Sequence, residues 1–392
     1  MRTKLPIIYF LVFCFLITGY AIIQADMYLN LPYIPDEKRF ANHIAHYHHS
    51  IGAKFDDLGG NIRAYLTLDP ALGYGSGYWA VHYWLTHSTS KLDLIRLFYL
   101  ILVLSIPLIL FVHSLLSKSK YKYLPVYTYL SFPIAWWYGK ITGPEPLSIW
   151  FSLVGLLMLL SDKKALSFLG WLLLGIGFGV KSTIFPIILF ITFIYLAKYR
   201  LDIISYISCL ALPIGFLIAN PFLASGTGLK NFLNSVSTHS HSGSFSWNAF
   251  LSLVSREGTT WEGLPNWGFL HWGFGIVGLL FFLAFLHINK LKNHLYSFVF
   301  CTIFSLILIS STIAYGWYCH PIWILVPVIL LQIKIDFRTK DTMLYLTIVF
   351  GSMTSFKFIA KSYVERVNMI EPELHTTIQT KMLKVLKPLI SS

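Results

Sequence analysis

Residues 5–24 read LPIIYFLVFCFLITGYAIIQ, a run with almost no polar side chains. About 20 apolar residues are enough for an α-helix to cross the hydrocarbon core of a bilayer, so this run is long enough for one crossing. Arg2 and Lys4 precede it, as basic residues precede the apolar core of a signal peptide. The run is too long for that core, and residues 24–26 (QAD) form a poor cleavage site, so we expect a retained membrane anchor.

The composition extends this interpretation to the whole chain. Of the 392 residues, 56% are hydrophobic and only 12% are charged, whereas soluble domains carry about 25% charged residues. Apolar runs recur along the chain, and no stretch is long and polar enough for a separate globular domain. We therefore predict an all-α polytopic membrane protein, with a single integral-membrane domain over residues 1–392. The four cysteines are scattered, without a disulfide framework or a metal-binding spacing.

The apolar runs predict a bundle of about eleven transmembrane helices. Every second connection between them is basic, which is typical of the cytoplasmic side of a membrane protein and supports this number. The same pattern explains the net charge of +13 without a nucleic-acid partner. The predicted spans lie near residues 5–24, 94–116, 123–138, 146–160, 165–180, 183–197, 203–223, 268–287, 294–314, 320–333 and 342–359.

Two long connections fall on the opposite, extracytoplasmic side. They cover residues 25–92 and 224–267, and both are rich in aromatic residues, histidine and glycine. We expect function there, because loops on a rigid scaffold carry most binding and catalytic sites. The tail, residues 361–392, is expected on the same side, with apolar residues at helical spacing. It predicts an amphipathic helix at the membrane surface, and a lid or partner-binding segment is the alternative.

Carboxylates mark two places on the predicted outer side. Asp36 and Glu37, in the sequence YIPDE, follow the first span, and Glu145 lies between two prolines at the start of the span near 146–160. Proline followed by acidic residues also suits the first turn of any helix, where negative charge meets the helix dipole. Carboxylates at the mouth of an apolar bundle nevertheless suit proton transfer, so all three are candidate catalytic residues.

Cations on the same side are candidates for binding a phosphate. Lys181 is the one cation of an otherwise apolar outer hairpin, and either a lipid phosphate or the membrane headgroups would explain its charge there. His320 begins the span near 320–333 and can donate to a phosphate or anchor the membrane interface. Arg256, in the second long loop, is a further candidate.

Histidines and tryptophans of the two loops suggest a metal and a stacking surface. His43 and His46 would share one face of a helix and could hold a divalent metal ion with an acidic residue. Most tryptophans fit an aromatic belt at the membrane interface. Trp247 and Trp261 lie well inside the second loop, where stacking on a sugar or a prenyl chain is plausible.

This arrangement resembles the GT-C superfamily of membrane glycosyltransferases. Residues 34–37 (IPDE) resemble the Pro-Asp-Glu motif of the GPI and lipid-linked-oligosaccharide mannosyltransferases, and also the Asp-Glu pair of the protein O-mannosyltransferase and aminoarabinose transferase branch. Glu145 is similar to the second acidic position, at the start of a later helix. Residues 317–321 (WYCHP) with Pro327 resemble the aromatic, proline-containing late span. That span lacks the arginine often found there, and no separate C-terminal globular domain follows.

The resemblance implies an inverting glycosyltransferase that moves a sugar from a polyprenyl-phosphate donor to a lipid, glycan or protein acceptor at the outer face of the membrane. Asp36 would be the base, and Glu37 and Glu145 would orient the acceptor or hold a divalent ion. Lys181, His320 and Arg256 would stabilise the leaving phosphate. The membrane would be the bacterial inner membrane with a periplasmic site, or that of the endoplasmic reticulum in a eukaryote.

Other classes of function remain open at this point. A polymerase or ligase of surface polysaccharide would share the outer site and the lipid-linked substrate. A lipid-linked-glycan transporter is the alternative outside the enzymes, but ion-coupled carriers usually place ionisable groups near the bilayer midplane. The middles of the predicted spans are almost free of such groups. A non-catalytic subunit of a glycosylation complex is the last alternative.

Overall fold

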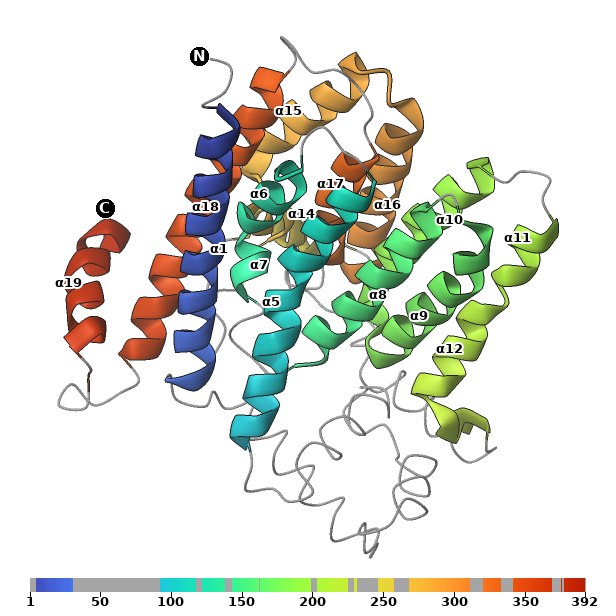
Figure 1. Ribbon diagram of the computed structural model, residues 1–392, viewed down its shortest axis with the longest axis horizontal. Coiled ribbons are helices and arrows are strands. Elements are labelled where there is room, and N and C mark those ends of the chain that lie inside the picture. The colour runs from blue at the N-terminus through green and yellow to red at the C-terminus, as the bar shows by residue number, and fades with distance from the viewer. Residues whose placement is uncertain are drawn as a thin grey trace, which may run out of the picture.

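The chain is all-α in the computed structural model, with no strand among the described residues (Figure 1). This confirms the all-α part of the predicted fold class. The structure describes residues 5–30, 92–117, 122–137, 143–161, 163–198, 203–224, 229–230, 246–256, 268–310, 320–332, 341–368, 375 and 377–391.

Most predicted spans coincide with one continuous helix. These helices are α1 (Leu5–Leu29), α5 (Leu92–Leu116), α8 (Pro144–Leu160), α9 (Ser167–Val180), α10 (Phe185–Lys198), α15 (Gly275–Ile288), α16 (Lys292–Ser310), α17 (His320–Leu331) and α18 (Asp341–Val367). The helix bounds lie within about five residues of the predicted ones, with two exceptions: α15 begins later than predicted, after the 3-10 turn η5 (Phe269–Trp272), and α18 continues past its predicted end.

The helices fit a membrane environment, but their lengths differ. Three helical segments are long and apolar enough to cross a bilayer by themselves: Phe10–Leu29, Leu94–Leu116 and Lys292–Ser310. Shorter apolar helices make up most of the rest, so the number of about eleven crossings stays a prediction. Large apolar side chains point away from the bundle, such as Phe15, which is 77% exposed. Such surfaces suit contact with lipid rather than with water.

Two of the predicted spans are broken helices. The span near 123–138 consists of α6 (Leu124–Leu130) and α7 (Pro133–Trp137), and the span near 203–223 of α11 (Ile203–Ser208), α12 (Ala211–Ala219) and the 3-10 turn η4 (Pro221–Ala224). Pro133 explains the first break, because a proline nitrogen cannot donate a hydrogen bond and the preceding residue avoids helical geometry.

Side chains of other helices satisfy the carbonyl groups at the first break. The Tyr20 hydroxyl of α1 donates to the Ala135 carbonyl oxygen at 2.9 Å, and the Ser355 hydroxyl of α18 donates to that of Ser131 at 2.6 Å. An irregular backbone inside a membrane needs such partners, since no water is at hand. The break therefore joins α1 and α18 to the centre of the bundle.

The core is centred on α17, which is surrounded on all sides. Its residues 322–331 are buried, and Trp323 is fully buried. The Trp323 ring stacks on Phe269 in the 3-10 turn η5 (Phe269–Trp272), with 4.6 Å between ring centroids, and its Nε1 donates to the Phe269 carbonyl oxygen at 2.9 Å. A side chain of this size fixes how α17 and η5 pack.

Small residues bring α8, α9 and α12 into close contact. Gly175 and Gly179 of α9 face Gly215 and Ala219 of α12, and a Cβ atom on Gly175 would collide with the Leu212 carbonyl oxygen. On its other side α9 meets α8, where a Cβ atom on Gly177 would collide with a serine hydroxyl. Small residues spaced by four allow helix backbones to approach this closely in membranes. We call these three helices the glycine-packed layer.

Candidate functional site

Glu145 is fixed by the start of α8. Gly143 is the N-cap residue, Pro144 opens the helix and Glu145 lies in its first turn. A proline suits the first position of a helix, since its missing N–H group would have no partner there, and a carboxylate in the first turn is favoured by the helix dipole. The local sequence therefore places the glutamate, and the bundle buries it to 9% exposure.

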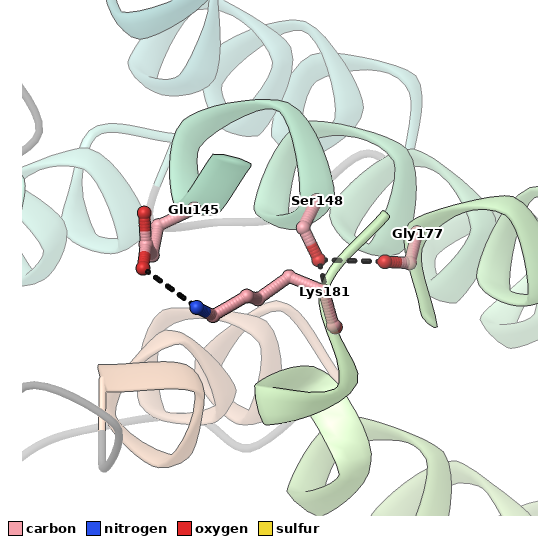
Figure 2. A network of polar contacts seen from close by, with 4 residues as sticks. All are labelled: Glu145, Ser148, Gly177 and Lys181. Carbon is pink, nitrogen blue, oxygen red and sulfur yellow. Dashed lines mark hydrogen bonds and ion pairs between the residues drawn. The ribbon is translucent and has the colours of Figure 1, made fainter. Parts of the chain in front are cut away.

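Lys181 is fixed by the end of α9. Its backbone nitrogen donates to the Gly177 carbonyl oxygen at 3.1 Å, which closes the last turn. The Ser148 hydroxyl of α8 lies 2.7 Å from the same carbonyl oxygen and 3.3 Å from that of Lys181 (Figure 2). The glycine-packed layer holds these backbones together, so the backbone of Lys181 lies against Ser148, which is one turn from Glu145 along α8.

The two side chains form a buried ion pair. Lys181 Nζ lies 3.5 Å from Glu145 Oε1, and the side chains are only 8% and 11% exposed, respectively (Figure 2). The other carboxylate oxygen, Oε2, is buried and accepts no hydrogen bond from the residues that the structure describes. A buried acceptor without a donor costs roughly 1–3 kcal/mol. Oε2 is therefore open to a donor from beyond the described residues, such as a ligand hydroxyl.

Polar residues of α1 and α5 complete the surroundings of this pair. Arg96 of α5 is buried at 3% exposure, and its Nη1 donates to the Tyr28 carbonyl oxygen at 3.0 Å, near the end of α1. Tyr99, one turn further along α5, is fully buried and interacts electrostatically with Tyr28 and with Glu145. Four helix ends thus meet here, those of α1, α5, α8 and α9, and we call this the site end of the bundle.

Sequence reasoning did not include Arg96, Tyr28, Tyr99 or Ser148 among the site residues. Only Arg96 gave a usable signal, because an arginine inside an apolar span needs a polar partner. The tyrosines and the serine resemble the many others of this chain, and only their position in three dimensions separates them.

The predicted cations do not all gather at the ion pair. Arg256 follows α14 (Trp247–Ser255) and is exposed, and no described contact joins its side chain to Glu145 or Lys181. His320 is the first residue of α17. The structure therefore brings together one predicted carboxylate and one predicted phosphate ligand, Glu145 and Lys181.

The remaining predicted residues have different outcomes. Trp247 is the first residue of α14 and is 70% exposed, with an edge-to-face contact to Phe250. Asp36, Glu37, His43, His46 and Trp261 lie outside the described residues. Among the residues that are described, no group of three or more histidine, cysteine, aspartate and glutamate side chains could hold a metal ion. The predicted metal site at His43 and His46 is untested.

Comparison of the chain with known protein families, with characterised proteins and with solved structures found no match. The resemblance to the GT-C superfamily therefore rests on the motifs of the chain itself. Of these motifs, the described residues include Glu145 in its proline-flanked position, the start of α17 at His320 and Pro327 within that helix.

Proposed function

We propose that this protein is an inverting membrane glycosyltransferase of the GT-C type. It would move a sugar from a polyprenyl-phosphate donor to a lipid, glycan or protein acceptor at the membrane surface. The observation that supports this best is the buried Glu145–Lys181 pair with its open carboxylate oxygen. The pair lies at the same end of the bundle as the last residues of α1, from which the chain continues into the segment with Asp36 and Glu37.

The reaction needs a base and a cation. Lys181 at this end of the bundle is the candidate cation, and Asp36, which follows α1 in the sequence, is the candidate base. An acceptor oxygen forms a bond to the anomeric carbon while the bond from that carbon to the phosphate oxygen breaks. The phosphate keeps the electron pair, and the acceptor proton passes to a carboxylate, which we assign to Asp36. The transition state is oxocarbenium-like, as in glycoside hydrolysis.

Lys181 and Glu145 have complementary roles in this proposal. The Lys181 ammonium group would stabilise the charge that develops on the leaving phosphate, since a cation held in place before the reaction needs no reorganisation. Glu145 Oε2 would accept a hydroxyl of the sugar or of the acceptor. In a variant of this proposal, Glu37 and Glu145 would be the residues that hold a divalent ion, which would supply positive charge to offset that of the leaving phosphate.

The proposed site faces the extracytoplasmic side, because the connections at the opposite end of the bundle are the basic ones. Lys163 follows the end of α8, which begins at the site end, Lys290 follows the end of α15, and Lys122 precedes the start of α6. In a bacterium this side is the periplasm, where a polyprenyl-phosphate sugar would be the donor.

Sugar transfer from polyprenyl-phosphate donors, measured with the purified protein in lipid nanodiscs, tests the proposal. We expect Asp36→Asn to lower the rate at least 10²-fold, because a general base contributes on that scale. Asp26→Asn is the matched control, since Asp26 is a carboxylate of α1 close to the same end, and it should keep most of the wild-type rate.

Two results would contradict the proposal in different ways. Full activity of Asp36→Asn would remove the assigned base while leaving the reaction in place. Inactive wild-type protein on every lipid-linked sugar would favour the polymerase, ligase or transporter alternatives, and movement of a lipid-linked glycan across proteoliposomes would then identify the transporter.

A further inference from the structure

The C-terminal helix α19 (Thr377–Ser391) is attached to the site end of the bundle. Its buried residues Leu383 and Leu386 pack against Ala360, Tyr363 and Val367 of α18, together with Met27 near the end of α1. In Figure 1 it lies at the edge of the molecule, beside α18 and on the side away from α8 and α9. The helix is therefore anchored by one apolar face, and its other faces point outward.

The depth of α19 in the membrane can be inferred from the exposed side chains of α18. Exposed apolar side chains occur on α18 up to Phe356, including Val349 at 51% and Met353 at 65% exposure. Lys357 and Lys361 come next in the sequence, and the residues of α18 in the cluster shared with α19 lie in the same stretch, from Ile359 to Val367. Apolar exposure gives way to charge where a helix leaves the hydrocarbon for the headgroup region. Consequently α19 is attached at the depth of the headgroups.

The outward surface of α19 is basic along one side. Lys381, Lys384 and Lys387 are all exposed, and residues three apart lie on neighbouring positions of one helix face. The helix sequence, TIQTKMLKVLKPLIS, contains no acidic residue. Val385, which is 61% exposed, adds an apolar side chain next to this lysine row. A basic face beside an apolar one is typical of helices that lie in a membrane interface.

We propose that the lysine row of α19 binds the phosphate groups of anionic phospholipids, with Val385 turned toward the acyl chains. Charge complementarity selects this occupant. A second copy of the same helix would bring lysines against lysines, and a zwitterionic lipid surface offers no net charge to attract them. The proposal is independent of the glycosyl-transfer proposal, since it concerns bulk lipid and a surface that contains no proposed catalytic residue.

Bound lipid would have a structural consequence for the site end. Because α19 packs on both α18 and α1, headgroups that hold α19 also hold these two helix ends in place. Each lysine near an anionic surface strengthens such binding by roughly fivefold. The effect should disappear at high salt, where charges are screened within a few ångströms.

An environment-sensitive fluorophore on Val385→Cys tests the proposal in the full-length protein. We expect its emission to shift to the blue in nanodiscs that contain 30% phosphatidylglycerol, and not in pure phosphatidylcholine. The triple variant Lys381→Gln/Lys384→Gln/Lys387→Gln should not show this shift. Protein without Val385→Cys, labelled in parallel, gives the background from the four natural cysteines.

The matched control replaces three exposed lysines at the opposite end of the bundle, Lys163→Gln/Lys290→Gln/Lys292→Gln, and should keep the shift. Polyprenyl phosphate at low concentration in phosphatidylcholine should produce no shift, which separates bulk phospholipid from the proposed substrate. Equal emission in both lipids, a shift that survives the lysine changes, or a shift with polyprenyl phosphate alone would overturn the proposal.

Discussion

Glu145 and Lys181 show how much a single buried pair depends on its partner. Taking either charge out of water costs several kcal/mol, and the attraction between the two offsets this cost only while both are present. The ion-pair distance of 3.5 Å, together with an Oε2 atom that no described residue pairs with, indicates a pair that is not optimised for stability. Such an arrangement fits residues kept for what they bind.

The first prediction concerns the stability of this pair. Glu145→Gln and Lys181→Met should each lower the free energy of unfolding by about 3–5 kcal/mol, because each leaves an uncompensated buried charge. The double variant should lose clearly less than the sum. Equilibrium unfolding in mixed micelles measures all three, with the exposed Lys163→Gln as the control. Additive losses would mean that the two charges do not interact.

The second prediction concerns the competition for Lys181. Where a phosphate binds this ammonium group, Glu145 is its competitor, so Glu145→Gln should bind inorganic pyrophosphate about tenfold more tightly, as expected when a charged contact of roughly 1.5 kcal/mol is removed. Lys181→Gln should lose the binding. Isothermal titration calorimetry gives both affinities, and unchanged affinity in both variants would assign the pair a purely structural role.

At the scale of elements, the glycine-packed layer sets the distance between α8, α9 and α12. The third prediction is that Gly175→Ala lowers the free energy of unfolding by about 1–3 kcal/mol, because the added methyl group collides with the Leu212 carbonyl oxygen. Gly19→Ala in α1 is the matched control, since a Cβ atom there meets nothing within 4 Å. It should be neutral or gain up to about 1 kcal/mol from helix propensity. Equal behaviour of the two variants would contradict the close packing.

The fourth prediction concerns the junction of α18 and α1. Burial, followed by the charge of Asp26 and a hydrogen bond to it, raises the pKa of Tyr363 above its ordinary value of 10.0. The folded protein then holds this proton more tightly than the unfolded chain, so stability is unaffected below pH 10 and falls above it. Unfolding followed from pH 8 to 11 should show a steeper fall for the wild type than for Tyr363→Phe. If the two stability curves were parallel, Tyr363 would not hold its proton more tightly in the folded protein, and the prediction would be wrong.

Helix existence could be predicted from the sequence, whereas helix continuity could not. Apolar runs are sufficient to place α1, α5 and α16, because a run of that length has few other solutions in a membrane. The break between α6 and α7 depends on Tyr20 and Ser355, which are distant from it in the sequence. Their hydroxyl groups donate hydrogen bonds to backbone carbonyl oxygens at the break. Because the sequence does not show which distant side chains will lie near this backbone, one continuous helix is the simpler prediction.

The candidate site was predictable only where the local sequence itself was unusual. A glutamate between two prolines and a lysine in an apolar hairpin are both unusual in their local sequence. Both were therefore predicted to be site residues. Their contact was not predicted, because it depends on how closely α8 and α9 approach through Gly177. Tyr99 gave no signal, since its burial beside Glu145 comes from the packing of α5.

At the scale of the whole molecule, the two ends of the bundle differ in character. One end gathers the buried polar residues Glu145, Lys181 and Arg96 and also carries the lysine row of α19, whereas the basic connections between helices lie at the other end. The fifth prediction is that an impermeant maleimide labels Arg256→Cys in intact cells but labels Lys290→Cys only after the membrane is opened. Both residues are exposed, so access is decided by the side of the membrane. The reverse pattern would invert the topology and remove the site from the extracytoplasmic face.

The hydrogen bonds from α1 to Ala135 also limit which insertions and deletions this chain can tolerate. Tyr20 and Gln24 fix α1 to the centre of the bundle, and Tyr28 meets Arg96 one turn later. One residue inserted between Gln24 and Tyr28 would rotate everything that follows by about 100° and separate the Tyr28 carbonyl group from the arginine. The same insertion after Asn30 would leave these contacts alone. Within this part of the chain, length variation should therefore be tolerated after Asn30 and not between Gln24 and Tyr28.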